Sequence, residues 1–257
     1  MSLKNLLNQI DTKKQKLDTL RPLNDKQLKN LKKMFDVDLT YNSNAIEGST
    51  LSFAETKLIL SEGITIGGKK LSEHLEVINH KEALDFIESL RHLKPEQLSL
   101  KDILDIHFLI LKGINTKDAG IFRVKPVGVR KSDGVIYQFT EPLKIKDEMD
   151  SFIEWLQECR DLHPVLLASE VHFRFVSIHP FIDGNGRAAR LLMNLIFLHY
   201  GYPQAVIKMT NRAEYILSIE KAQDSGILDD FYQVVANAVD ESLDTYLNIL
   251  QQDIELI

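Results

Sequence analysis

Apolar residues recur every three or four positions along most of the chain, the spacing that places them on one face of an α-helix. Helix start signals accompany this period in several places: Ser99 precedes one segment, Ser72 and Glu73 open another, and Pro142 opens a third. The pattern predicts a mainly α protein. The predicted helices cover residues 3–18, 25–41, 53–61, 71–92, 98–112, 142–158, 162–177, 186–199, 211–223 and 228–253.

The segment from 121 to 140 departs from this period. Its valines and aromatic residues flank Lys131-Ser-Asp-Gly134, and Asp-Gly between such runs is typical of a β-hairpin. An isolated pair of strands is only marginally stable in water. We therefore expect this hairpin to lie over another part of the molecule, such as a binding cleft.

Proline and glycine are scattered along the chain, so no clear linker or domain boundary stands out. We expect an N-terminal helical region at 1–95, a core at 96–235 that includes the hairpin, and a C-terminal helix at 236–257.

Composition places the chain among ordinary globular proteins, with 257 residues, 44% hydrophobic and 26% charged. A net charge of -6 argues against a general nucleic-acid binder, which needs a basic surface. The first residues carry charges inside the apolar run, so neither a signal peptide nor a membrane span is expected. A single cysteine, Cys159, excludes an internal disulfide and fits a cytoplasmic location.

The densest chemistry lies in residues 179–190, which hold a base, a carboxylate, a Gly-Asn-Gly turn and two arginines. Pro180 is expected to push His179 out of the helical region into an extended loop. Gly184 and Gly186 allow positive φ, so backbone N–H groups can form a nest for an anion. The helix that follows presents its N-terminus there, with Arg187 and Arg190 on one face. Such a stretch can bind a phosphate.

This stretch, His179-Pro-Phe-Ile-Asp-Gly-Asn-Gly-Arg-Ala-Ala-Arg190, resembles the signature of Fic-domain proteins at every fixed position. The likeness extends to Gly120-Ile-Phe-Arg123 and to Arg212-Ala-Glu-Tyr215. It implies the Fic fold, a helical bundle with one β-hairpin flap. Upstream, Ser43-Asn-Ala-Ile-Glu47-Gly48 resembles the inhibitory-helix motif of one class of the family, within an N-terminal helical extension. Glu47 shares a helix face with Ser43, and Gly48 ends the helix.

The resemblance implies transfer of AMP from ATP to a Tyr, Thr or Ser hydroxyl of a protein target. His179 would be the general base, and Asp183 would hold Mg²⁺ together with substrate phosphates and water. Arg187 and Arg190 would bind the β- and γ-phosphates. The phosphate cradle would consist of the backbone of Gly184, Asn185 and Gly186, with the Asn185 side chain as a further donor.

The resemblance also assigns residues around this centre. The flap would clamp the main chain of the target, and Glu47, by pairing with Arg190, would displace the γ-phosphate and inhibit the enzyme. Val129, Arg130, Lys131 and Ser132 would line the nucleotide side of the flap. Tyr215, Ile216 and Gln223 would lie on the adenine side.

Several alternatives remain open at this point. A Fic fold could use a different donor or mainly remove AMP, and a non-catalytic regulator would need no base at His179. The helical surfaces are compatible with a homodimer. Gly63-Ile-Thr-Ile-Gly-Gly-Lys-Lys70 resembles a Walker A loop but lacks its final hydroxyl and follows a helix, so a surface turn is favoured. The lysines between Lys26 and Lys33 indicate a solvated helix face, with contact to a partner as the alternative.

Overall fold

The computed structural model describes residues 1–159 and 161–252, and this part of the chain is mostly helical, with one small β-hairpin. The helices are α1 (Leu3–Thr19), α2 (Asp25–Ile46), α3 (Phe53–Glu62), α4 (Leu71–Ser89), α5 (Leu100–Leu111), α6 (Ile145–Glu158), α7 (Pro164–Ile178), α8 (Asn185–His199), α9 (Arg212–Ser225) and α10 (Asp229–Gln252). Three short 3₁₀ turns lie at Pro95–Gln97, Pro142–Lys144 and Met209–Asn211. The fold class predicted from the sequence is confirmed.

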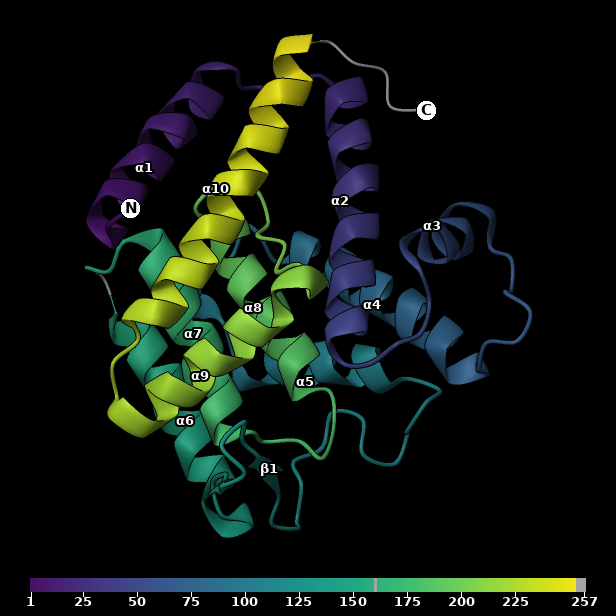
Figure 1. Ribbon diagram of the computed structural model, residues 1–257, viewed down its shortest axis with the longest axis vertical. Coiled ribbons are helices and arrows are strands. Elements are labelled where there is room, and N and C mark those ends of the chain that lie inside the picture. Colours follow the sequence, from purple (N-terminus) through teal and green to yellow (C-terminus); the bar gives the residue numbers. More distant parts are fainter. Residues whose placement is uncertain (160, 253–257) are drawn as a thin grey trace.

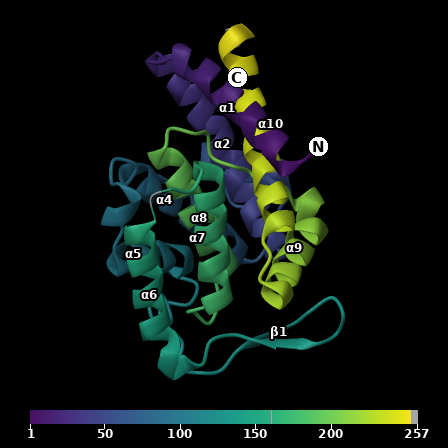
Figure 2. The same cartoon turned by 90° about the vertical axis from the view of Figure 1, so that its left-hand side faces the viewer.

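Helix α8 forms the centre of the molecule (Figure 1). It is buried from Arg187 to Phe197 without interruption, because α7 packs beside it and α4 and α5 also pack against it. Helix α1 lies along α10, and α2 runs beside them toward the middle of the molecule (Figures 1 and 2). Burial on all sides explains why α8 after its first turn is mostly apolar, with Arg190 and Asn194 as the buried polar exceptions.

One hydrophobic core runs through nearly the whole described chain. It includes Leu6 of α1, Phe35 of α2, Phe197 of α8 and Leu247 of α10. The regions expected at 1–95, 96–235 and 236–257 therefore all contribute to one core, and the end of the last region, from 253 on, lies outside the described residues. A second, small cluster consists of Leu51, Ile59 of α3 and Val77 of α4.

Helix α2 continues beyond the predicted end at residue 41 and reaches Ile46. Asn and Ser are weak helix formers, which is why the pattern alone indicated an earlier end. Here Asn42, Ser43 and Asn44 are buried, Asn42 accepts a hydrogen bond from the Met209 N–H, and Ser43 contacts Arg190. Tertiary contacts therefore extend the helix up to the predicted inhibitory residues.

The hairpin consists of β1 (Gly128–Arg130) and β2 (Ile136–Gln138), which pair antiparallel with Val129 opposite Tyr137. It leaves the helical body at one end and runs beneath α9 (Figure 2). Gly134 takes φ 86° in the connecting turn, a conformation that favours glycine. No helix in the described part of the chain combines the length and apolarity that crossing a membrane requires.

Candidate phosphate-binding site

His179 ends α7 and begins the loop that leads to α8. Its φ of 53° and ψ of 58° are left-handed, and its N–H closes the helix by donating to the Phe175 carbonyl at 3.1 Å. The expectation of an extended conformation at His179 was wrong. Pro180 disfavours the right-handed helical region for the preceding residue, and the left-handed region instead lets His179 cap the helix.

The imidazole of His179 is held in one orientation. Its Nδ1 lies 3.2 Å from the Val176 carbonyl, so Nδ1 carries the proton and Nε2 is left as the basic nitrogen. Phe139, at the end of the hairpin, stacks on the ring at 3.8 Å. Burial lowers the pKa of His179 to about 4, so the ring is neutral near pH 7 and can accept a proton.

Two side chains fix the loop between His179 and α8. Asn185 accepts from the Phe181 N–H and donates to the Phe181 carbonyl, at 3.0 and 2.8 Å. Asn185 is 2% exposed, and its side-chain amide bonds to Phe181 at both ends. Its expected use as a phosphate donor stays a prediction. His107 stacks on Phe181 at 3.5 Å and bridges the Asp183 carbonyl to the Gly120 N–H.

The first turn of α8 presents backbone N–H groups that the helix itself does not use. Gly184 takes φ 78° at the N-cap, and the first backbone bond of this helix runs from the Ala188 N–H to the Gly184 carbonyl. The preceding amides can therefore face an anion, with the positive end of the helix dipole behind them. Gly186, which was also expected at positive φ, keeps an ordinary helical conformation.

Arg187 is almost fully buried beside this turn. One end of its guanidinium lies 3.4 Å from Asp183, whose carboxylate is 63% exposed, and the other lies 3.6 Å from Glu76 of α4. Burial raises the pKa of Glu76, and the charge of Arg187 opposes that shift. Glu76 lies more than 100 residues from the motif in sequence, so no local pattern could have indicated it.

Arg190 lies at the meeting point of α8, α2 and α9. Its guanidinium donates to Glu47 at 2.8 Å, to the Ser43 hydroxyl at 3.0 Å and to the Ser43 carbonyl at 2.9 Å. A further nitrogen contacts the Tyr215 hydroxyl at 3.3 Å. The pairing of Glu47 with Arg190 that the sequence predicted is present.

Three features bring the Glu47 carboxylate to this place. Glu47 is the cap residue of α2, and Gly48 follows with φ 100°, so the chain turns away at once. Arg212 donates to the Ile46 carbonyl at 2.8 Å, at the negative end of the α2 dipole. Gly186 leaves room for the carboxylate, since a Cβ there would collide with Glu47 Oε1.

The hairpin is attached to the body at both its base and its tip. At the base, the Arg123 guanidinium donates to the carbonyls of His179, Lys125 and Thr140. The sequence pointed to Arg123 only as part of the flap resemblance and gave it no role. Arg123 thus links Lys125 and Thr140, at the two ends of the hairpin, to the backbone of His179.

At the tip, the flap residues meet acidic side chains of α9. Lys131 pairs with Asp224, and Ser132 donates to Glu220 through its N–H and its hydroxyl. Val129 is 43% exposed and Arg130 is also exposed. Their expected contact with a nucleotide stays a prediction.

The three residues expected on the adenine side differ in exposure. Tyr215 is 2% exposed, and its hydroxyl contacts His172 at 2.7 Å and Arg190. Its ring therefore presents no face to a nucleotide here, and its contacts support Arg190 instead. Ile216 and Gln223 are half-buried, and their assignment stays a prediction.

The fold and this site define a helical protein with a glycine turn at a helix N-terminus, a neutral histidine beside it and two buried arginines behind it. Residues 97–197 match the model of the Fic/DOC family, and the chain belongs to that family. The site loop lies inside the matched range.

Relatives and solved structures resemble the chain over most of its length. A protein adenylyltransferase Fic of Nematostella vectensis is 34% identical over 94% of this chain and 56% of its own length. A Fic-domain-containing signaling protein of Bacteroides thetaiotaomicron has a TM-score of 0.88 at 28% identity, covering 95% of this chain and 97% of its own. Fic-1 of Caenorhabditis elegans has a TM-score of 0.85 at 29% identity, covering 98% of this chain and 74% of its own. The chain spans about half the length of the curated relatives it matches.

Proposed function

We propose that the chain is a protein adenylyltransferase, which moves AMP from ATP to a Tyr, Thr or Ser hydroxyl of a protein, itself included. The observation that carries this proposal is a single loop with a neutral base at one end and a helix N-terminus with two buried arginines at the other. The name of the Nematostella relative supports it.

Each group has a task in this reaction. Nε2 of His179 takes the proton of the attacking hydroxyl, whose oxygen forms a bond to the α-phosphorus. The bond between the α-phosphorus and the oxygen leading to the β-phosphate breaks, and pyrophosphate leaves. The amides at the start of α8 receive phosphate oxygens, while Arg187 and Arg190 bind the β- and γ-phosphates.

Asp183 is suited to hold Mg²⁺. Its carboxylate is 63% exposed and directly precedes the phosphate-binding turn. Mg²⁺ binds through one or two carboxylates, with waters and substrate phosphates completing its shell. When bound, the ion would neutralise charge on the triphosphate.

Glu47 inhibits the transfer in this proposal. While its carboxylate occupies Arg190, the γ-phosphate lacks its guanidinium partner, and the α-phosphate is not aligned with the target hydroxyl. Activity would then require Glu47 to leave Arg190.

Incubation with ATP labelled at the α-phosphate tests the activity. We expect the Glu47→Gly variant to label itself and the Glu47→Gly, His179→Ala double variant to remain unlabelled. ATP labelled at the γ-phosphate is the control, since it leaves no label after AMP transfer. Label from the γ-phosphate would indicate a kinase instead and would contradict the proposal.

The remaining expectations concern the setting of the enzyme. A protein target, a homodimer, a cytoplasmic location and the lack of binding to nucleic acid or membrane all stay predictions.

A further inference from the structure

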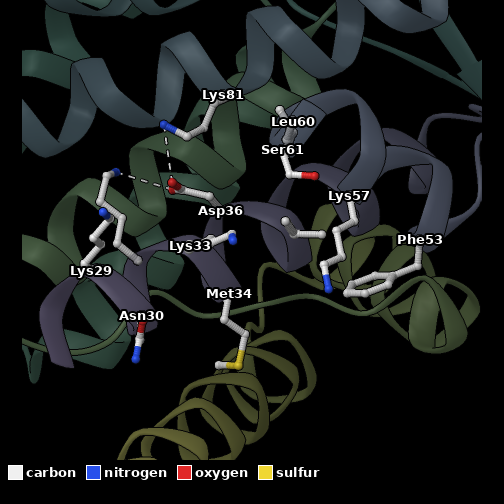
Figure 3. A pocket seen from close by; sticks show the side chains of 12 residues that line it. Lys29, Asn30, Lys33, Met34, Asp36, Phe53, Lys57, Leu60, Ser61 and Lys81 are labelled. Atoms are coloured by element: carbon white, nitrogen blue, oxygen red, sulfur yellow. Dashed lines mark hydrogen bonds and ion pairs between the residues drawn. The ribbon is translucent and has the colours of Figure 1, made fainter. Parts of the chain in front are cut away.

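A groove remote from the proposed phosphate site lies between α2 and α3, and Lys81 of α4 also lines it (Figure 3). Its volume is about 440 Å³. Met34 and Val37 of α2 line one wall at helical spacing, and Phe53 and Leu60 of α3 line the other. Two helices thus present facing apolar stripes with a space between them that a third helix would fill.

The edge of the groove is positively charged. Lys29 and Lys33 on α2 and Lys57 on α3 are exposed, and within residues 1–159 and 161–252 none of the three forms an ion pair. Lys32 and Lys81 differ, since both lie close to Asp36 and Asp85. Because the whole chain carries a net charge of -6, this rim stands out against the rest of the molecule.

We propose that the groove docks an acidic amphipathic helix of a partner protein. Its apolar face would enter between Met34 and Phe53, and its acidic flanks would meet Lys29, Lys33 and Lys57. Recognition of this kind lays apolar side chains spaced three and four residues apart into a hydrophobic groove, while complementary charges set orientation and specificity.

The dimensions of the groove fit such an occupant. From Lys29 to Val37 the wall of α2 extends over about 12 Å, which corresponds to roughly two turns of a docked helix. Phe53 is 41% exposed at the edge of the groove, so a docked helix would bury a large aromatic surface there. The same helix α2 leads to its cap residue Glu47, about 15 Å beyond Val37, so a docked partner would touch the helix that positions the proposed inhibitor.

Binding is tested with a short fluorescein-labelled peptide that carries leucines at helical spacing and glutamates beside them. Fluorescence anisotropy with the full chain is expected to show saturable binding that weakens as salt is added. The Lys29→Glu, Lys33→Glu, Lys57→Glu variant should bind about tenfold more weakly or worse. A Lys4→Glu, Lys16→Glu, Lys117→Glu variant has the same change of charge on other exposed lysines and should bind like the wild type.

A second variant tests the apolar part without removing any contact. Ser61→Trp places a large side chain in the groove and should block the peptide, while the circular dichroism spectrum remains unchanged. Equal affinity of the wild type and both groove variants would overturn the proposal.

Two other occupants give different outcomes, and each would also overturn it. If the wild type is a dimer that the groove variants convert to a monomer, the groove binds a second copy of the chain. If dodecanoate binds in the groove and the peptide does not, the ligand is a small amphiphile. These assays do not depend on AMP transfer, so their failure would leave the proposed activity unaffected.

Discussion

Arg190 is the residue around which the site is organised. A buried guanidinium needs partners, because leaving such a charge unpaired costs about 3–5 kcal/mol. Glu47 supplies one of these partners, and Ser43 and Tyr215 supply the others. A triphosphate could satisfy the same need, which makes the two anions competitors for one cation.

Gly186 allows a test of this contact through stability alone. Alanine in a helix is favoured over glycine by up to about 1 kcal/mol, but a Cβ at Gly186 would collide with Glu47 Oε1. We therefore expect Gly186→Ala to lower the thermal midpoint of the wild type and to leave that of the Glu47→Gly variant unchanged or higher.

The new Cβ would also lie 3.2 Å from Nη1 of Arg190. Because Arg190 is present in both backgrounds, this contact serves as the internal control. The same shift in both backgrounds would show that Glu47 does not occupy this space.

The sequence revealed the residues of the site that lie close together along the chain. Residues 179–190 could be predicted because the chemistry is local, and Glu47 could be predicted because its motif resembles a known one. His107 and Glu76 could not be predicted, since only the packing of α5 and α4 on α8 brings them there. The bonds by which Asn185 holds the loop could not be predicted, because they form with Phe181 only once the loop is folded.

At the scale of elements, α9 links several parts of the site. Its first residue, Arg212, holds the end of α2, and its first turn places Tyr215 against Arg190. Its last turns bind the tip of the hairpin through Glu220 and Asp224. Glu47, the proposed inhibitor, and the hairpin are therefore attached to the same helix.

Arg212→Ala is expected to raise self-labelling with AMP, but less than Glu47→Gly does. The substitution removes the donor to the Ile46 carbonyl and loosens the last turn of α2, yet it leaves the Glu47 carboxylate in the chain. Intact-mass analysis after incubation with ATP and Mg²⁺ measures the effect. Arg91→Ala, which removes an exposed arginine elsewhere, is the matched control. Labelling by Arg212→Ala no higher than by Arg91→Ala would contradict a positioning role.

The helices could be predicted because apolar residues recur every three or four positions along most of the chain and several helices have start signals. Their ends were less certain where tertiary contacts prevail over propensity, as at the end of α2. The attachment of the hairpin tip to α9 joins residues about ninety positions apart, and no periodicity carries that information.

For the whole molecule, several histidines lie inside the folded structure in neutral form. Burial lowers the pKa of His80 and His172 to about 3 and that of His107 and His179 to about 4. The unfolded chain binds protons at these groups below about pH 6.5, whereas the folded chain does not. Above that pH these histidines do not lower the free energy of unfolding. They lower it as the pH falls toward their pKa values in the folded state.

We expect the urea midpoint of the wild type to fall between about pH 7.5 and about pH 5. His172→Phe removes one of these groups and should make the decline shallower. His92→Phe replaces an exposed histidine outside the core; it is the matched control and should follow the wild type. A His172→Phe profile parallel to that of the wild type would contradict this explanation.

The central claim is that Glu47 and the triphosphate compete for Arg190 in an AMP-transferring enzyme. The most direct measurement is the intact mass of the wild type, the Glu47→Gly variant and the Glu47→Gly, His179→Ala variant after incubation with ATP and Mg²⁺. We predict that the Glu47→Gly variant gains the mass of AMP, that the wild type gains far less, and that the double variant gains none. Equal gain in the wild type and the Glu47→Gly variant, or no gain in either, would contradict the account.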